Sequence, residues 1–303
     1  METLKCGKIE WVHIENPSKK DMEFLKKNFN FHPIILDELL QPSTRSRVER
    51  YNQYLFMPYH FPVYDRTIKN SRRAEIDFLI TKNSVITVSY ERLEAVQNMR
   101  GALLNNASMH VRVKSQGTGL LVYYLIQEII NFSLRQLRHV QEKIESVNSQ
   151  LFKGTEDELL GYISHLKSDV LEYQIVTRPQ QIILESLREI GEKFWGLKMK
   201  VYLTDLTGDF MKIIQLIELH KEAIDGLETT NAQLLNVKTN KVMQRFTVLA
   251  FLTFPLMLLV ALLDIDAISR SMLGGPYDFW IIFGGVAIIV AVMSIYFKKK
   301  GWL

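Results

Sequence analysis

The chain has 303 residues, more than one ordinary domain usually holds, so its length predicts at least two modules. Its net charge of +4 is too small to indicate nucleic-acid binding, and the basic residues around Arg45, Arg47 and Arg50 read as a solvated surface. A single cysteine, Cys6, excludes an internal disulfide framework and predicts a reducing compartment. The first residues lack the apolar segment of a signal peptide.

Residues 1–118 predict a cytoplasmic α/β domain. Lys8 to Ile14 alternates as a strand does, and Pro33 opens a short helix from Ile34 to Leu40. Two β-rich runs between Ile76 and Tyr90 predict a hairpin that turns at Lys82 and Asn83, and Tyr54 to Tyr64 is also β-prone.

Beyond this domain the pattern is helical, because prolines are rare and apolar residues recur at three- and four-residue steps. We expect long antiparallel helices over 119–191 and a stalk helix over 192–245. The expected fold class is therefore an α+β cytoplasmic domain followed by a long stalk helix and a C-terminal pair of helices.

Two uncharged apolar runs, Phe246 to Leu263 and Phe279 to Phe297, predict a transmembrane hairpin. Each run is near the ~20 residues that a helix needs to cross a bilayer. Buried core helices of a soluble protein are the alternative, but the basic flanks of the runs disfavour it.

Charges around the hairpin predict its orientation. Basic residues lie outside both runs, whereas the segment 264–278 between them is acidic. By the positive-inside rule, both chain ends are cytoplasmic, 264–278 is an external loop and 298–303 is a basic cytoplasmic tail. The basic residues are Lys238, Lys241, Arg245, Lys298, Lys299 and Lys300, and the loop contains Asp264, Asp266, Asp278 and Arg270.

A seven-residue repeat places one stripe of residues along the first span. Its ends are small or polar and its middle, at Phe254 and Met257, is bulky and apolar. The stripe predicts a pore with a hydrophobic constriction, while ordinary close packing of helices through small residues is the alternative. Asp264 at the external end favours the pore. The stripe comprises Asn240, Met243, Thr247, Ala250, Phe254, Met257, Ala261 and Asp264.

Four segments resemble the CorA family of magnesium channels. Phe31 to Glu38 (FHPIILDE) resembles the HPxxLxD-type segment of the family, and Leu79 to Asn83 (LITKN) resembles its hairpin. Lys238 to Met243 (KTNKVM) is similar to the start of its pore helix, and Tyr296 to Leu303 (YFKKKGWL) to its C-terminal end.

This resemblance implies a funnel-shaped homopentamer in the cell membrane that conducts divalent cations, with Mg²⁺ as the first candidate ion and Co²⁺ as the second. It implies that Asn240, Met243, Phe246 or Thr247, Phe254 and Met257 lie at pore positions. It also implies that Glu38 and Asp205 bind regulatory Mg²⁺ between subunits and close the channel. Both are carboxylates, as a hard cation requires, although each is also compatible with an ordinary surface acid.

The external end of the first span departs from the family pattern. The Gly-Met-Asn signature is missing, and Asp264, Ile265 and Asp266 take its place. A ring of aspartates would attract cations more strongly than neutral amides and would hold them longer. We therefore expect altered selectivity or affinity at an external mouth formed by Asp264 and Asp266.

The sequence lacks the common motifs of enzymes. Walker A, GxGxxG, HExxH and GxSxG sequences are absent and the histidines are scattered, so we expect neither an enzyme nor an organic cofactor. Two alternatives stay open: a zinc or cobalt carrier, including a proton-coupled one, and a non-conducting scaffold that senses metal. The missing signature favours the scaffold.

Overall fold

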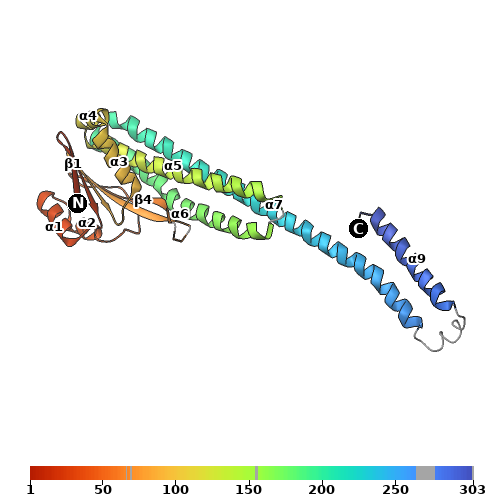
Figure 1. Cartoon of the computed structure of the whole chain (residues 1–303). Coiled ribbons are helices and arrows are strands. Elements are labelled where there is room, and N and C mark those ends of the chain that lie inside the picture. Colours follow the sequence, from red (N-terminus) through yellow and green to blue (C-terminus); the bar gives the residue numbers. More distant parts are fainter. Residues whose placement is uncertain (66, 69, 154–155, 264–276, 302–303) are drawn as a thin grey trace. The chain divides into compact units, whose positions relative to one another are not determined.

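The computed structural model describes residues 1–65, 67–68, 70–153, 156–263 and 277–301 (Figure 1). Its contacts divide the chain into two compact units, Met1–Glu228 and Thr229–Leu303.

The first unit is built on a six-stranded sheet with the order β1-β2-β6-β5-β4-β3. Neighbouring strands are antiparallel except β2 and β6, which run parallel with Trp11 opposite Val85. β4 and β5 form a long hairpin that pairs Leu55 with Ile80 and Asp65 with Asn70. The strands are β1 (Glu2–Cys6), β2 (Ile9–Glu15), β3 (Glu49–Arg50), β4 (Leu55–Asp65), β5 (Asn70–Ile80) and β6 (Ser84–Ser89).

Helices cover both faces of this sheet. Helices α1 (Lys19–Asn28) and α2 (Pro33–Glu38) pack on one face, where Leu25, Ile35 and Phe56 are almost fully buried in a common apolar core. Helices α5 (Thr118–Gln150) and α6 (Glu156–Trp195) pack on the other face against β4, β5 and β6. Because both faces are covered, β4, β5 and β6 are buried along most of their length, including several of their polar residues.

Two glycines lie at breaks between consecutive helices, one before α5 and one before α7. Gly117, with φ of +88°, lies between α4 (Ala107–Gln116) and α5, and α3 (Glu94–Asn105) precedes α4. Gly196, with φ of +97°, follows the last residue of α6, and α7 (Lys198–Leu263) begins two residues later. A residue with a Cβ would be strained at these φ values, so glycine is favoured. The stalk helix therefore begins at Lys198 rather than at residue 192.

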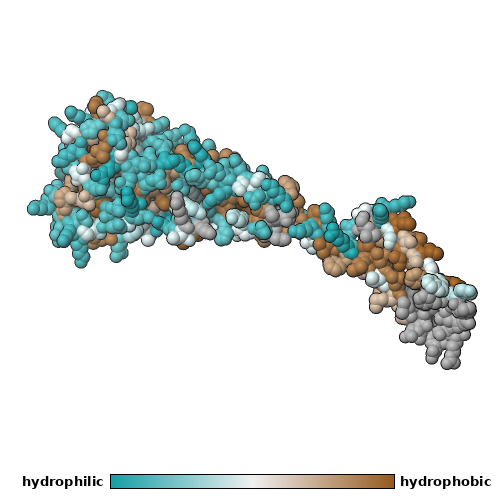
Figure 2. Space-filling model, viewed as in Figure 1, coloured by the Kyte–Doolittle hydropathy of each residue, from teal (hydrophilic) through white to brown (hydrophobic). Residues whose placement is uncertain are grey.

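The second unit contains the C-terminal part of α7 and helix α9 (Asp278–Lys299). Apolar side chains dominate its visible surface (Figure 2). Within the part of the chain that the structure describes, one helical segment, Lys198–Leu258, contains a window long and apolar enough to span a membrane. Only 6% of that window is buried, unlike the core helix of a soluble protein.

Candidate functional site

The predicted pore stripe lies on α7 and points away from the rest of its unit. Phe254 and Met257 are 70% and 71% exposed, and Met243 is 60% exposed. Asn240, Ala250 and Ala261 are also exposed, whereas Thr247 is half-buried and donates a hydrogen bond to the Met243 carbonyl at 2.8 Å. A single chain thus leaves this apolar stripe without cover.

A different face of α7 packs within the unit. Val248 is buried at 3% exposure, and the Phe251 ring lies 6.2 Å from the ring of Phe297 on α9. Phe297 is itself buried at 6% exposure. The contact between the two helices therefore uses residues outside the stripe, so packing within the chain does not account for the small residues Ala250 and Ala261.

The predicted external mouth, Asp264 and Asp266, lies outside the described residues. So does most of the predicted loop 264–278 and the end of the tail 298–303. The mouth and the loop therefore stay predictions from the sequence.

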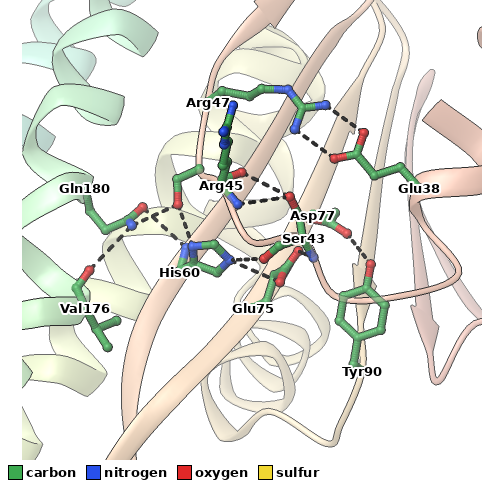
Figure 3. Close-up of polar contacts among 11 residues, drawn as sticks. Glu38, Ser43, Arg45, Arg47, His60, Glu75, Asp77, Tyr90, Val176 and Gln180 are labelled. Carbon is green, nitrogen blue, oxygen red and sulfur yellow. Dashed lines mark hydrogen bonds and ion pairs between the residues drawn. The ribbon is translucent and has the colours of Figure 1, made fainter. Parts of the chain in front are cut away.

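Glu38, the first candidate metal ligand, is held by an arginine (Figure 3). The two terminal nitrogens of Arg47, Nη1 and Nη2, each donate a hydrogen bond to the Glu38 carboxylate at 2.7 Å. Arg47 Nε donates to Glu49 at 2.9 Å. The hydrogen bonds and charge of Arg47 lower the pKa of Glu38. This carboxylate is therefore ionised at neutral pH, but a metal would have to share or displace Arg47 to bind it.

Asp205, the second candidate, lies on the exposed side of α7 and accepts a hydrogen bond from the Tyr123 hydroxyl at 2.8 Å. Burial, and then the hydrogen bond to Asp205, raises the pKa of Tyr123 above its ordinary value. One turn further along, Asp209 accepts hydrogen bonds from Gln127 at 2.8 Å and Lys212 at 2.7 Å. Asp205 thus keeps oxygen lone pairs for another ligand.

The structure does not assemble a complete metal site from these groups. Within the described ranges, no three His, Cys, Asp or Glu side chains are arranged to hold a metal ion. Glu38 contacts Arg47 and Asp205 contacts Tyr123, and each carboxylate is compatible with a site that is completed by another chain.

Sequence reasoning missed a buried polar cluster on β4 and β5 (Figure 3). Glu75, Asp77 and His60 have exposed fractions of only 6%, 2% and 4%. His60 Nε2 lies 3.1 Å from Glu75, whose other oxygen accepts a hydrogen bond from the Ser43 amide at 2.8 Å. Tyr90 donates to Asp77 at 2.7 Å, while Asp77 Oδ1 has no hydrogen-bond partner.

Burial in this cluster favours the neutral form of one carboxyl group. Burial, and then the nearby charge of Glu75, raises the pKa of Asp77 well above its ordinary value. Alternation in the sequence could have revealed the pair, because Glu75 and Asp77 share one face of β5 inside an apolar run. The register that places His60 opposite Glu75 could not have been read from the sequence.

Comparisons with known proteins agree with these features. The sequence matches the family described as "CorA-like Mg2+ transporter protein" over residues 7–299. The chain is 21% identical to the cobalt/magnesium transport protein CorA of Thermotoga maritima, over 97% of this chain and 83% of that protein. A CorA of the same description from Methanocaldococcus jannaschii is 18% identical, over 98% and 92% of the two chains.

A solved structure shows the same fold. The complete structure of the CorA magnesium transporter from Methanocaldococcus jannaschii superimposes with a TM-score of 0.85 at 17% identity, covering 99% of this chain and 93% of that one. The family match covers nearly the whole chain, both the α+β domain and the long helix. It also confirms the expectation that the chain is not an enzyme, since the family is one of transporters. The chain therefore belongs to the CorA-like Mg²⁺ transporter family.

Proposed function

We propose that this protein is a passive channel for divalent metal cations, Mg²⁺ first and Co²⁺ second. The observation that carries the proposal is the family match over residues 7–299, together with relatives described as cobalt/magnesium transport proteins. The chain contains no nucleotide-binding motif, so the ion gradient and the membrane potential supply the driving force. A divalent ion gains ~4.6 kcal/mol for each 100 mV that it crosses.

The pore forms between copies of the chain, because two spans cannot enclose one. We propose a homopentamer in the cell membrane, with both chain ends cytoplasmic and 246–263 and 279–297 spanning the bilayer. The exposed stripe on α7 supports this arrangement, since five copies would cover it around a common axis. Phe254 and Met257 would then form a hydrophobic constriction that gates by dewetting.

The external mouth determines which ions enter. A ring of Asp264 and Asp266 would concentrate divalent cations through their charge and bind them through hard oxygen ligands. Such a ring would bind cations more tightly than neutral amides and would release them more slowly.

Cytoplasmic Mg²⁺ closes the channel through Glu38 and Asp205 on neighbouring subunits. Each carboxylate has its own partner within one chain, Arg47 or Tyr123, and Arg47 would have to give up part of its contact with Glu38. Flux into proteoliposomes should therefore fall as internal Mg²⁺ rises. The Glu38→Gln/Asp205→Asn variant should lose this dependence while it keeps its flux at low internal Mg²⁺.

The proposal is tested by flux into proteoliposomes that contain the purified protein and an internal Mg²⁺ indicator. Co²⁺ and Zn²⁺ are measured in parallel, with and without a pH gradient. We expect Mg²⁺ entry that falls at least tenfold in the Asp264→Asn/Asp266→Asn variant. The matched variant Glu15→Gln/Glu23→Gln, which removes two exposed charges from the first unit, should conduct normally.

Two results would contradict the channel. Zn²⁺ entry that requires a pH gradient would indicate a proton-coupled carrier. The absence of flux for all three ions, from a folded oligomer at low internal metal, would indicate the metal-sensing scaffold that the missing Gly-Met-Asn signature favours.

A further inference from the structure

One cavity of the first unit differs in charge from the others. It has a volume of about 560 Å³ and lies between the end of α1, the turns that follow β3 and β5, and the end of α6. Three cationic side chains line it, Arg50, Lys82 and Lys193, and its lining contains no aspartate or glutamate. Cavities of this size hold small organic ligands.

The acidic residues closest in sequence to these cations are paired elsewhere. Glu49, next to Arg50, accepts hydrogen bonds from Arg47 and Tyr51 at 2.9 Å. Glu192, next to Lys193, lies 3.1 Å from Lys200. Among the residues that the structure describes, no carboxylate forms an ion pair with Arg50 or Lys193.

Lys82 is held in place without losing its charge. Its ammonium donates a hydrogen bond to the Phe194 carbonyl and lies 4.3 Å from the centre of the Phe194 ring. Neither contact supplies a negative charge. The cavity therefore gathers three positive charges that only an external anion can neutralise.

The remaining lining suits the oxygens of an anion. Side-chain amides of Asn52, Gln53 and Asn83 add neutral hydrogen-bond donors to the same cavity. Phe31 and Tyr54, whose rings meet edge to face at 4.9 Å, give it a buried aromatic wall. Arginine binds phosphate with two parallel hydrogen bonds, and lysine adds a point charge.

Two further cavities of the first unit lack this character. The cavity of about 620 Å³ between β4, α5 and α6 contains Glu158 and Asp169 beside Lys143. The neighbouring cavity of about 760 Å³ contains Glu94, Glu142 and Asp169 beside its own cations. The cavity lined by Arg50, Lys82 and Lys193, here named the α1–α6 cavity, thus differs from these two cavities because it has positive charges and no acidic residue.

We propose that the α1–α6 cavity is a binding site for a small phosphorylated compound, whose phosphate contacts Arg50, Lys82 and Lys193. The cytoplasmic domain would then respond to a soluble phosphate ester as well as to metal. This site is separate from the pore stripe and from Glu38 and Asp205. Its test uses binding alone and does not depend on whether the protein conducts ions.

The test is isothermal titration of the full-length protein in detergent, with EDTA present to remove divalent metal. Inorganic pyrophosphate and ADP are the soluble probes, and dihexanoyl phosphatidic acid represents a lipid headgroup. We expect pyrophosphate or ADP to bind more tightly than the phosphatidic acid. Binding should weaken at least tenfold in the Arg50→Gln/Lys193→Gln variant, and raising the salt concentration should weaken it in the unmodified protein.

The matched control is Lys20→Gln/Arg178→Gln, which removes the same charge from exposed positions outside all three cavities. It should bind the probes as the unmodified protein does. Arg50 and Lys193 are exposed, so their replacement should leave the thermal unfolding midpoint without ligand unchanged. Equal weakening in both variants, tighter binding of phosphatidic acid, or no binding of any probe at millimolar concentration would overturn the proposal.

Discussion

Glu38 and Asp77 are carboxyl groups of the same α/β domain whose pKa values are shifted in opposite directions. Arg47 lowers the pKa of Glu38 through two hydrogen bonds and its charge. Asp77 is buried beside Glu75 without a cation at hydrogen-bond distance, so its pKa is raised. The surroundings, rather than the residue type, therefore decide in which direction the pKa of each carboxyl group is shifted.

We predict that Asp77 makes the protein less stable as the pH rises. Because its pKa is raised, the folded chain releases the Asp77 proton at a higher pH than the unfolded chain does, where an aspartate titrates near pH ~3.9. The stability that this proton contributes is complete below that pH and is lost as the pH rises through the raised pKa of the folded state. Asp77→Asn keeps the shape of the side chain and removes the ionisation. The thermal unfolding midpoint of this variant, relative to that of the unmodified protein, should therefore rise from pH 5 to pH 8.

Tryptophan fluorescence during thermal unfolding measures this effect, because Trp11 is buried in the same sheet. The control is Asp37→Asn, which removes an exposed carboxyl group one residue before Glu38. A difference between Asp77→Asn and the unmodified protein that stays constant with pH would contradict the prediction.

At the scale of one helix, α7 presents two faces with different roles. Phe251 contacts Phe297 on α9 and Val248 is buried, whereas Phe254 belongs to the uncovered stripe. We predict that Phe254→Ala widens the constriction and lets water enter it, so Mg²⁺ flux at high internal Mg²⁺ should rise several-fold. The measurement is the proteoliposome assay with Mg²⁺ on both sides.

Phe251→Ala is the matched control, since it removes the same ring from the face that contacts Phe297. It should lower the thermal unfolding midpoint by loss of packing and should not raise the flux. A rise in flux of the same size in both variants would show that Phe254 has no special place in the pathway.

The sequence predicted the elements with strong local signals. The hairpin of β5 and β6 follows from two β-rich runs around Lys82 and Asn83, and the helix α2 from Pro33. The short strands β1 and β3 were missed, because few of their residues are buried. The break at Gly196 was misplaced because the helical pattern continues on both sides of a very short turn.

The candidate sites were predicted less completely for a similar reason. Glu38 and Asp205 were identified by resemblance, but their partners Arg47 and Tyr123 lie on other elements. Arg47 was read with Arg45 and Arg50 as solvated surface, whereas it bridges Glu38 and Glu49. Contacts between distant segments depend on the path of loops and on strand register, which local patterns do not specify.

At the scale of the whole molecule, we predict an assembly of five chains. Phe254 and Met257 are about 70% exposed in a single chain, and the stripe cannot form a pore without other copies. Native mass spectrometry from detergent should give five times 35.3 kDa. A dimer or a monomer as the largest species, under conditions that preserve flux, would contradict the prediction.

The parallel pairing of β2 with β6 also has a consequence for biosynthesis. The middle of the sheet cannot close until Ser89 has been synthesised, yet every strand is complete long before Phe246. At about 5–20 residues per second, the ribosome needs on the order of 10 s to travel between these two positions. The strands thus have time to pair during translation, before the first apolar run of the C-terminal unit is synthesised and can be recognised by the insertion machinery.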